Sequence, residues 1–205
     1  MAALWLASLI TGSFFLTRYA DTPGSDGPAP SKWPSGVSVP RDLNLPTLVM
    51  FLHPYCPCSR ASVGELALIM AHRHGRVAGV VVIAANEGLD DPLRSGLARD
   101  AALIPGVTVL CDQDGNAARR FHIATSGGVV LYDKNESLLF DGGITSARAH
   151  SGDNDGRDAV EALVAGKESI TRTTPTYGCP IFNVEPCAST PKCRANLTPL
   201  VSLPK

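Results

Sequence analysis

The chain lacks any cluster of basic residues and any long run of one charge, and its formal net charge is −1 with a pI near 6.5. Nucleic acids are bound by clustered Lys and Arg, so this balance argues against such a partner. The chain also lacks a Gly-rich nucleotide loop, a Walker sequence, a haem-type Cys-x-x-Cys-His string and internal repeats. No organic cofactor is therefore expected. Charged residues make up only 18%, which suits a chain with a membrane or export segment.

Positive charge is absent ahead of Arg18, which leaves residues 2–17 as an uncharged and largely apolar run. As a helix this run would span about 25 Å, slightly less than the ~30 Å hydrocarbon core of a bilayer. A signal peptide needs a basic start and a small-x-small cleavage site, and this run is poor in both. We therefore expect residues 1–19 to form an uncleaved transmembrane anchor; a cleaved signal segment and a buried core helix are the alternatives.

Cysteine usage indicates the compartment. The chain has six cysteines, and Cys179, Cys187 and Cys193 lie close together near its end, which fits an oxidising compartment better than the cytosol. Arg18 and Lys32 follow the apolar run and mildly oppose export of what comes after it. We give the cysteines more weight, and expect a membrane-anchored protein whose folded domain lies on the periplasmic or extracytoplasmic side.

Composition divides the rest of the chain into three parts. Residues 20–41 are rich in Pro and Gly, as in a flexible or extended linker. Residues 42–168 carry alternating strand-like and helix-like patterns and are expected to form the folded domain. Residues 169–205 combine many prolines with three cysteines and show little core-forming pattern. We expect them to be an irregular tail, held over the domain by disulfides.

Short apolar runs alternate with helical patterns through the central region. The 46–53 run is apolar on both faces, as in a central parallel strand, and 59–73 has apolar residues at helical spacing. The order of elements predicts parallel strands joined by crossover helices plus an antiparallel edge hairpin. This is the thioredoxin-like α/β architecture, a central mixed sheet with flanking helices. The expected strands are 46–53, 77–84, 107–111, 128–132 and 138–140, and the expected helices are 59–73, 91–102, 114–122 and 155–167.

Two cysteines one residue apart, Cys56 and Cys58, fall where the first strand gives way to a helix. Unsatisfied N–H groups and the helix dipole stabilise a thiolate at a helix N-terminus, and the thiolate is the reactive form of cysteine. The order strand, cysteine pair, helix is the sequence sign of a thioredoxin-like redox site. Two structural cysteines that merely pack or bridge elsewhere are the alternative.

Three strings resemble RedB-type proteins of the thioredoxin-like superfamily. They are residues 51–62 around the cysteine pair, residues 124–127 (Ala-Thr-Ser-Gly) and residues 142–154, which begin Gly-Gly-Ile-Thr. The likeness runs from about residue 46 to residue 181. It implies a thioredoxin fold, a membrane-associated extracytoplasmic location and thiol–disulfide exchange with a protein partner.

The chain departs from ordinary thioredoxins at two places. Aligning Glu65 with the glutamate that usually follows the redox site puts Cys56 on the nucleophilic cysteine and Ser59 on the second one. The second thiol of the usual Cys-x-x-Cys motif thus stands one position earlier, at Cys58. Residues 126–127 stand where a cis-proline normally faces the site. The residues expected to support the site are His53, Pro57, Ser59, Ser126 and Gly127.

Cys56 is the nucleophile candidate, as the more exposed thiol just before the helix, and Cys58 is the candidate resolving thiol. A bridge between them would close a very small ring, and strain makes a disulfide more reducible. The sequence therefore predicts a relatively oxidising couple, or a Cys56 that resolves with a tail cysteine.

Basic side chains near the motif have several open roles. His53 lies three residues before Cys56, where it could favour the thiolate as a nearby cation, accept a proton, or be a satisfied polar residue. Arg148 and His150 lie in a Gly-rich loop that this architecture can bring back to the site. A role in the site and a role in orienting the loop are both open for them.

Metal binding is the second function class. Cys56 and Cys58 with His53 or His150 are the ligand types that hold Cu(I), although thioredoxin-like copper chaperones space their cysteines more widely. The tail cysteines lack the paired spacing of a zinc site. We expect one disulfide among them, with one thiol left free or paired with Cys111. Peroxide reduction is disfavoured, because a histidine stands where a peroxidatic site carries a hydroxyl.

The sequence is best interpreted as a membrane-tethered, extracytoplasmic thiol–disulfide oxidoreductase with a thioredoxin-like fold. Cys56 would attack a partner disulfide, and Cys58 or a tail cysteine would release the partner from the mixed disulfide. A Cu(I) carrier on the same fold and a non-catalytic thioredoxin-like module are the two competing interpretations.

Overall fold

The computed structural model describes residues 2–85 and 91–182. At its centre is a six-stranded sheet with the strand order β3-β2-β1-β4-β5-β6. Strands β1, β2 and β3 are parallel, β4 and β5 continue the sheet antiparallel, and the two-residue β6 pairs parallel with β5. This is the mixed sheet of a thioredoxin-like α/β fold, and of the strands in the described residues β6 is the one that the sequence did not predict. The bounds are Thr47–Leu52 (β1), Ala78–Ala84 (β2), Val107–Asp112 (β3), Gly128–Tyr132 (β4), Leu138–Gly143 (β5) and Thr173–Thr174 (β6).

The central strand is apolar on both faces because each face of the sheet carries its own core. All six residues of β1 are buried. Leu48, Met50 and Leu52 pack into one core, whereas Val49 and Phe51 pack into the other. This alternation is the period-2 geometry of a strand. Strand β1 ends at the carboxyl edge of the parallel strands, and the cysteine motif begins directly after it.

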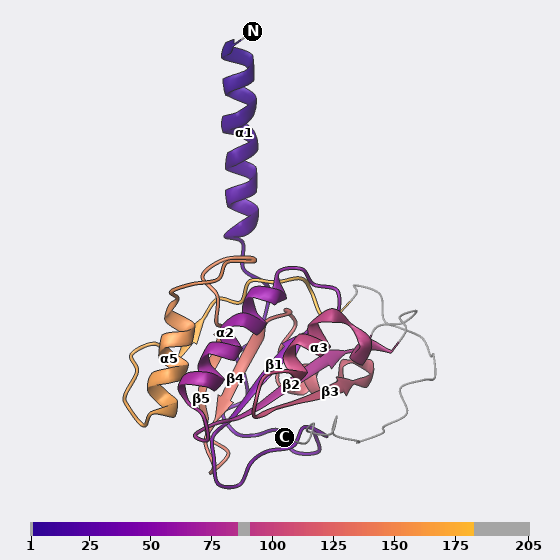
Figure 1. Ribbon diagram of the computed structural model, residues 1–205, viewed down its shortest axis with the longest axis vertical. Coiled ribbons are helices and arrows are strands. Elements are labelled where there is room, and N and C mark those ends of the chain that lie inside the picture. The colour runs from indigo at the N-terminus through magenta and orange to yellow at the C-terminus, as the bar shows by residue number, and fades with distance from the viewer. Residues whose placement is uncertain (1, 86–90, 183–205) are drawn as a thin grey trace.

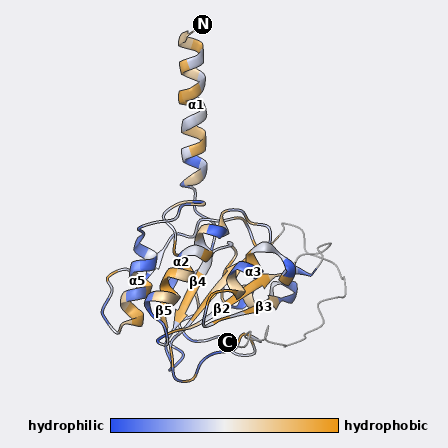
Figure 2. Ribbon diagram, viewed as in Figure 1, coloured by the Kyte–Doolittle hydropathy of each residue, from blue (hydrophilic) through white to orange (hydrophobic). Residues whose placement is uncertain are grey.

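Three helices cover one face of the sheet: α2 (Ser59–His72), α3 (Gly96–Ala102) and α5 (Asp155–Val164) (Figure 1). The short helix α4 (Asn116–Arg120) and parts of the irregular segments cover the other face. Figure 2 shows the strongly apolar strands beneath the more polar helices. Helices α3 and α4 are shorter than the sequence predicts, because the 3-10 turns η1 (Pro92–Arg94) and η2 (Gln113–Gly115) precede them.

The N-terminal residues form α1 (Ala2–Ala20), which projects away from the domain (Figure 1). None of its residues is buried, so it is not a core helix. Within residues 2–85 and 91–182, however, no helix has the length and apolar character needed to cross a membrane. The segment expected to be an anchor is thus observed as a helix that projects from the domain.

The Pro- and Gly-rich segment after α1 follows an irregular path, as its composition predicts, but it packs on the domain. The centroid of the Trp33 ring lies 5.2 Å from that of Phe121 and 5.3 Å from that of Tyr132. The Asp26 carboxylate accepts 2.7 Å hydrogen bonds from the backbone N–H groups of Ala124 and Thr125. The segment therefore helps to hold the loop that precedes β4.

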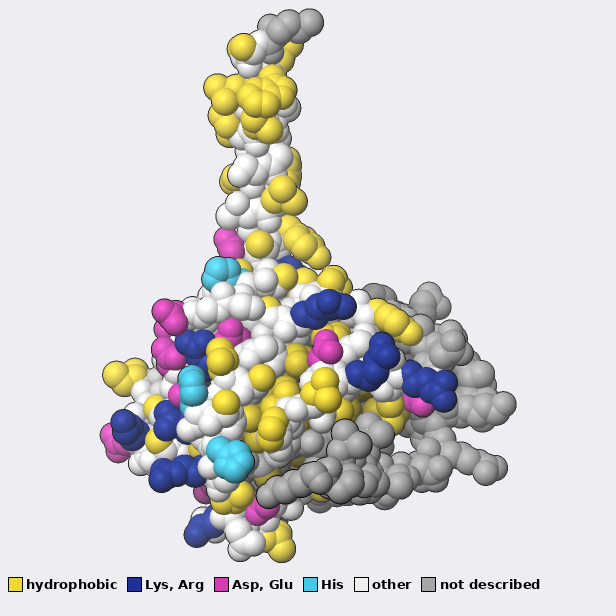
Figure 3. Space-filling model, viewed as in Figure 1, with side chains coloured by type: hydrophobic (Ala, Val, Ile, Leu, Met, Phe, Trp, Pro, Cys, Tyr) yellow, Lys and Arg dark blue, Asp and Glu magenta, His cyan; other side chains and the backbone are white. Residues whose placement is uncertain are grey.

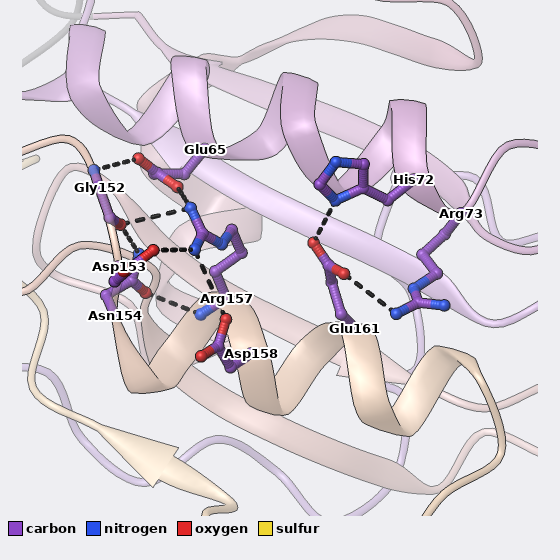
Figure 4. Close-up of polar contacts among 9 residues, drawn as sticks. All are labelled: Glu65, His72, Arg73, Gly152, Asp153, Asn154, Arg157, Asp158 and Glu161. Atoms are coloured by element: carbon purple, nitrogen blue, oxygen red, sulfur yellow. Dashed lines mark hydrogen bonds and ion pairs between the residues drawn. The ribbon is translucent and has the colours of Figure 1, made fainter.

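A buried ion pair joins α2 to α5 (Figure 4). The Glu65 side chain is 2% exposed, and its carboxylate lies 2.7 Å from Nη1 of Arg157. The same carboxylate accepts a 2.8 Å hydrogen bond from the N–H of Gly152. Further along, Glu161 of α5 contacts Arg73, just past the end of α2, at 3.0 Å. These contacts fix α2, the helix that begins at the cysteine motif.

Candidate active site

The cysteine motif occupies the turn between β1 and α2. The carbonyl of Cys56 accepts a 3.2 Å hydrogen bond from the N–H of Ser59, and the carbonyl of Cys58 accepts one of 3.2 Å from Ala61. Cys58 is the N-cap residue of α2 and already has helical dihedral angles, φ −65° and ψ −31°. Cys56 therefore stands just ahead of the helix N-terminus, in the position that the sequence predicts.

A third cysteine, Cys179, lies against this motif, although it is 123 positions from Cys56 in the chain. The sulfurs of Cys56, Cys58 and Cys179 all lie within 4.8 Å of one another. The backbone N–H of Cys179 donates to Sγ of Cys56 at 3.4 Å. A long-range contact thus completes a cluster of three thiols.

The segment around Cys179 is held by backbone hydrogen bonds to the loop before β4. The N–H of Ser126 donates to the carbonyl of Cys179 at 2.8 Å, and the N–H of Ile181 donates to the carbonyl of Ala124 at 2.7 Å. An antiparallel bridge also joins these two stretches. Cys179 is therefore held in place much as a residue of a neighbouring strand would be.

Gly178 allows the two stretches to approach so closely. A Cβ atom at this position would lie 1.8 Å from the carbonyl oxygen of Ser126, a distance that no side chain tolerates. The guanidinium of Arg148 also donates a hydrogen bond to the carbonyl of Gly178. A residue without a side chain is therefore required here, and its neighbours hold Cys179 toward Cys56.

Both cysteines of the motif are buried, with exposed fractions of 1% for Cys56 and 8% for Cys58. The expectation that Cys56 is the more exposed thiol is therefore wrong. Cys56 is buried because the segment that carries the half-buried Cys179 contacts it directly. Access of a partner to Cys56 consequently depends on this segment.

The pKa of Cys56 is lowered from 9.0 to about 7. Burial, the largest single effect, raises this pKa because it disfavours the charged thiolate. Hydrogen bonds from the side chains and backbones of Ser59 and Cys179 outweigh it. About half of the Cys56 population is therefore ionised at pH 7, compared with about 1% for a thiol with a pKa of 9.0.

The two neighbouring thiols are shifted in the other direction. Burial and the negative charge of Cys56 raise the pKa of Cys58. Burial and the contact with Cys56 raise the pKa of Cys179 to about 12. The positive charge of Arg148 offsets part of both shifts. A single thiolate, on Cys56, is therefore held between two protonated thiols.

A buried pair of hydroxyls lies next to Cys56. The Oγ atoms of Ser59 and Ser126 are 2.6 Å apart, and the N–H of His53 donates to Oγ of Ser126 at 2.7 Å. Because the Ser59 hydroxyl donates to the Cys56 thiolate, the Ser126 hydroxyl must donate to Ser59. The hydrogen bonds therefore run in one direction, toward the sulfur.

Replacing Ser126 with alanine is expected to raise the pKa of Cys56 and to destabilise the fold. The change removes the donor to Ser59 and the acceptor for the N–H of His53, and an unsatisfied buried group costs about 1–3 kcal/mol. The pH midpoint of Cys56 alkylation and the free energy of unfolding measure these effects. Ser151→Ala, at an exposed loop position, is the control. A midpoint that stays unchanged in Ser126→Ala would contradict the hydroxyl chain.

One glycine and one proline that were expected near the site, Gly127 and Pro57, also lie there. Gly127 has a φ of +94°, a conformation that glycine adopts freely, and its N–H donates to the carbonyl of Phe51 at 2.8 Å. Pro57, between the two cysteines, is exposed. Gly127 therefore ties the loop before β4 to the end of β1.

Neither histidine considered from the sequence belongs to the thiol cluster of the described chain. Nδ1 of His53 accepts a 3.2 Å hydrogen bond from the N–H of Tyr55, and burial lowers the pKa of His53. The ring is therefore neutral at neutral pH and is not the nearby cation. The positive charge of Arg148 acts on the neighbouring thiols Cys58 and Cys179. His150 is exposed.

Within the described part of the chain, the three clustered sulfurs could hold a metal ion, and thiolates suit soft ions such as Cu(I). The third ligand would be Cys179, which corrects the histidine expected from the sequence. Cys111 lies on β3, outside the cluster, and no disulfide joins the cysteines described. The zinc set and the tail disulfides considered from the sequence involve Cys187 and Cys193, which lie outside the described residues.

Sequence reasoning placed Cys179 among the possible disulfides and, as one of three tail cysteines, among the alternative resolving thiols, but it did not predict which tail cysteine contacts Cys56. The one local signal is the Gly-Cys-Pro string at residues 178–180, since glycine and proline mark a specially shaped backbone. That signal does not say which loop the segment meets. The hydrogen bond from Arg148 to Gly178 could likewise not be predicted from the sequence, because it joins residues from separate loops.

A cavity of about 610 Å³ opens beside the motif. Tyr55, which is 57% exposed, connects it to the cysteines. Basic side chains are visible near α3 on this face of the molecule (Figure 3). The remaining lining residues are Asp91, Arg94, Ser95, Gly96 and Arg99. The cavity offers space and positive charge next to the site.

Comparison with solved structures shows similarity to a hypothetical protein from Sinorhizobium meliloti, with 23% identity, a TM-score of 0.56, and coverage of 79% of this chain and 96% of that chain. An uncharacterized conserved protein from Geobacillus kaustophilus has 19% identity and a TM-score of 0.59, over 82% and 95% of the two chains. A secreted disulfide oxidoreductase from Mycobacterium tuberculosis has 19% identity and a TM-score of 0.45, over 60% and 84%. No protein-family model and no curated protein matches the chain. Likeness at these identities concerns the fold.

Proposed function

We propose that this thioredoxin-like protein is a thiol–disulfide oxidoreductase whose nucleophile is Cys56. The position of the Cys56 sulfur carries the proposal. This sulfur lies just ahead of the α2 N-terminus, accepts a hydrogen bond from the N–H of Cys179, and has two more sulfurs within 4.8 Å. A thiolate at such a position can attack a disulfide, and a thiol beside it can release the product.

In the proposed reaction, the thiolate of Cys56 attacks a disulfide of a protein partner, and one partner sulfur leaves as a thiolate. A second thiol of the cluster then attacks the Cys56 sulfur of the mixed disulfide. The partner departs fully reduced, and the protein is left with a disulfide. The same steps in reverse oxidise a partner. The reduction potentials of the two couples set the direction.

We further propose that the partner docks over the motif and the adjacent cavity, where Tyr55 and the arginines of α3 and η1 are available for contact. The six cysteines of the chain support a location in an oxidising compartment outside the cytoplasm. The resemblance of residues 51–62 to RedB-type proteins supports the same reaction class.

Alkylation of Cys56 is expected to show a pH midpoint near 7 in the folded protein. Only the thiolate reacts, so below the midpoint the rate should fall about tenfold per pH unit. Iodoacetamide labelling at a series of pH values, read at Cys56 by peptide mass spectrometry, measures the midpoint. The same thiol in guanidinium-unfolded protein is the control and should titrate near its ordinary value of about 8.5.

Two results would overturn the proposal. The first is a midpoint in the folded protein that equals or exceeds the unfolded one. The second is a Cys56→Ser variant that reduces a disulfide substrate as fast as the unsubstituted chain, because neither Cys58 nor Cys179 has the same hydrogen-bond donors.

A further inference from the structure

We propose that the redox-active disulfide joins Cys56 to Cys179, so that Cys179 and not Cys58 is the resolving thiol. This inference rests on the proposed function of Cys56 as the nucleophile. It assigns the resolving role to one particular cysteine of the C-terminal segment, whereas the sequence left Cys58 and any of the tail cysteines as alternatives.

Cys179 approaches Cys56 from a separate and well-held stretch of backbone. Its carbonyl accepts a hydrogen bond from the N–H of Ser126, and its own N–H donates to Sγ of Cys56. A disulfide needs an S–S distance of about 2.05 Å, so the sulfurs, now within 4.8 Å, must move closer. Because the two cysteines belong to different segments, rotation of their side chains can contribute to this movement without closing a small ring of backbone.

Cys58 is poorly placed to form the same bond. A Cys56–Cys58 ring would enclose Pro57, whose φ is locked near −65°. It would also include Cys58, which already has the helical conformation that starts α2. Closing the ring would therefore distort the first turn of α2. The contacts of Glu65 further along this helix oppose such a shift.

Burial of the nucleophile fits the same assignment. Cys56 is 1% exposed and is covered by the segment that carries Cys179. A partner that reaches Cys56 must displace this segment, and its return brings the Cys179 sulfur back onto the mixed disulfide. By then Cys56 carries no charge, so one cause that raises the pKa of Cys179 is gone, while the positive charge of Arg148 remains.

The steps balance without a further reagent. The Cys56 thiolate attacks a partner disulfide, which forms one S–S bond and releases one partner thiolate. Cys179 gives up its proton to solvent and attacks Sγ of Cys56, which forms the internal disulfide and releases the second partner thiolate. Two electrons pass from the two cysteines to the partner. The partner disulfide is reduced, and the protein is oxidised.

The test uses the full chain with Cys111, Cys187 and Cys193 replaced by serine, so that the three clustered thiols remain. This background and its Cys58→Ser and Cys179→Ser derivatives are each mixed with one equivalent of 5,5′-dithiobis(2-nitrobenzoate). The probe is an aromatic disulfide whose released thiolate is coloured. Attack by Cys56 releases one thiolate per probe molecule, and resolution releases the second. Digestion and mass spectrometry then identify the linked peptides.

The background and Cys58→Ser are expected to release two thiolates, with Cys56 linked to Cys179. Cys179→Ser is expected to stop at one, with the other half of the probe still disulfide-bonded to Cys56. The inference is overturned if Cys179→Ser releases two thiolates and Cys58→Ser only one, a result that leaves the proposed function standing. Failure of Cys56 to react in any variant would overturn the proposed function itself.

A second measurement covers the case in which a variant does not fold. The unsubstituted chain is oxidised with one equivalent of the same probe, and its cross-linked peptides are mapped. A bond between Cys56 and Cys179 supports the inference, and a bond between Cys56 and Cys58 overturns it.

Discussion

A Gly178→Ala variant is expected to lose the elevated ionisation of Cys56. The added Cβ would lie 1.8 Å from the carbonyl oxygen of Ser126, so the segment that carries Cys179 must move away. Cys56 then loses its hydrogen bonds from Cys179, and its pKa rises from about 7 toward the ordinary value. A rise of one pKa unit lowers the thiolate fraction at pH 7 about fivefold.

The same displacement should also uncover the sulfur, which is 1% exposed in the intact protein. Gly178→Ala is therefore expected to show two changes in one pH profile of Cys56 alkylation: a higher midpoint, and a faster limiting rate at pH values where the thiol is fully ionised. A general loss of structure would instead bring the profile to that of the unfolded chain. Circular dichroism on the same samples separates the two cases.

Gly64→Ala is the matched control. This glycine lies inside α2, and a Cβ there meets no atom within 4 Å. Alanine is favoured over glycine in a helix by up to about 1 kcal/mol, so the variant should be equally or more stable, with the Cys56 midpoint unchanged. If Gly178→Ala behaved like this control, Cys179 would not be the residue that tunes Cys56.

An Arg157→Met variant is expected to lose about 3 kcal/mol of stability or more. Glu65, whose side chain is 2% exposed, would keep its charge in the interior without the guanidinium that lies 2.7 Å away. Breaking a buried pair by removing one partner is costly because an uncompensated charge is left behind. Urea or guanidinium unfolding of the variant and of the unsubstituted chain measures the difference.

Two control variants test whether the loss comes from the unpaired buried charge. Replacing both Glu65 and Arg157 with methionine should recover most of the loss, because no buried charge is left unpaired. Arg94→Met removes one member of an exposed pair with Asp91 at 3.8 Å and should change stability by no more than about 1 kcal/mol. An Arg157→Met variant as stable as Arg94→Met would show that the α2–α5 pair does not hold the fold.

Much of the fold could be predicted from the sequence because its signals are local. The apolar run of β1 and the helical spacing of α2 set both elements to within a residue or two, and the cysteine motif falls between them. The structure of the N-terminal half of the predicted helix 91–102 was harder to predict from the sequence. There Ser95 accepts from the N–H of Ala98 and starts α3 afresh, after the separate turn η1.

The membrane assignment and the exposure of Cys56 could not be settled in the same way. Hydropathy of residues 2–17 indicates an apolar helix, and α1 is indeed a helix, but its apolar character falls short of what a membrane span requires. The burial of Cys56 depends on a segment more than a hundred residues later in the chain. No local pattern reports which distant segment will lie over a site.

By itself, the sequence determined where a reactive sulfur would stand, because strand and helix propensities act over neighbouring residues and leave Cys56 at their junction. Only the tertiary structure decided what surrounds that sulfur. Packing of the sheet and its covering segments brings three separate loops together there: the N–H of Cys179 donates to the sulfur, Ser126 contacts Ser59, and Arg148 donates to the carbonyl of Gly178. A thiolate depends on such donors and charges, so its ionisation is a property of the assembled fold.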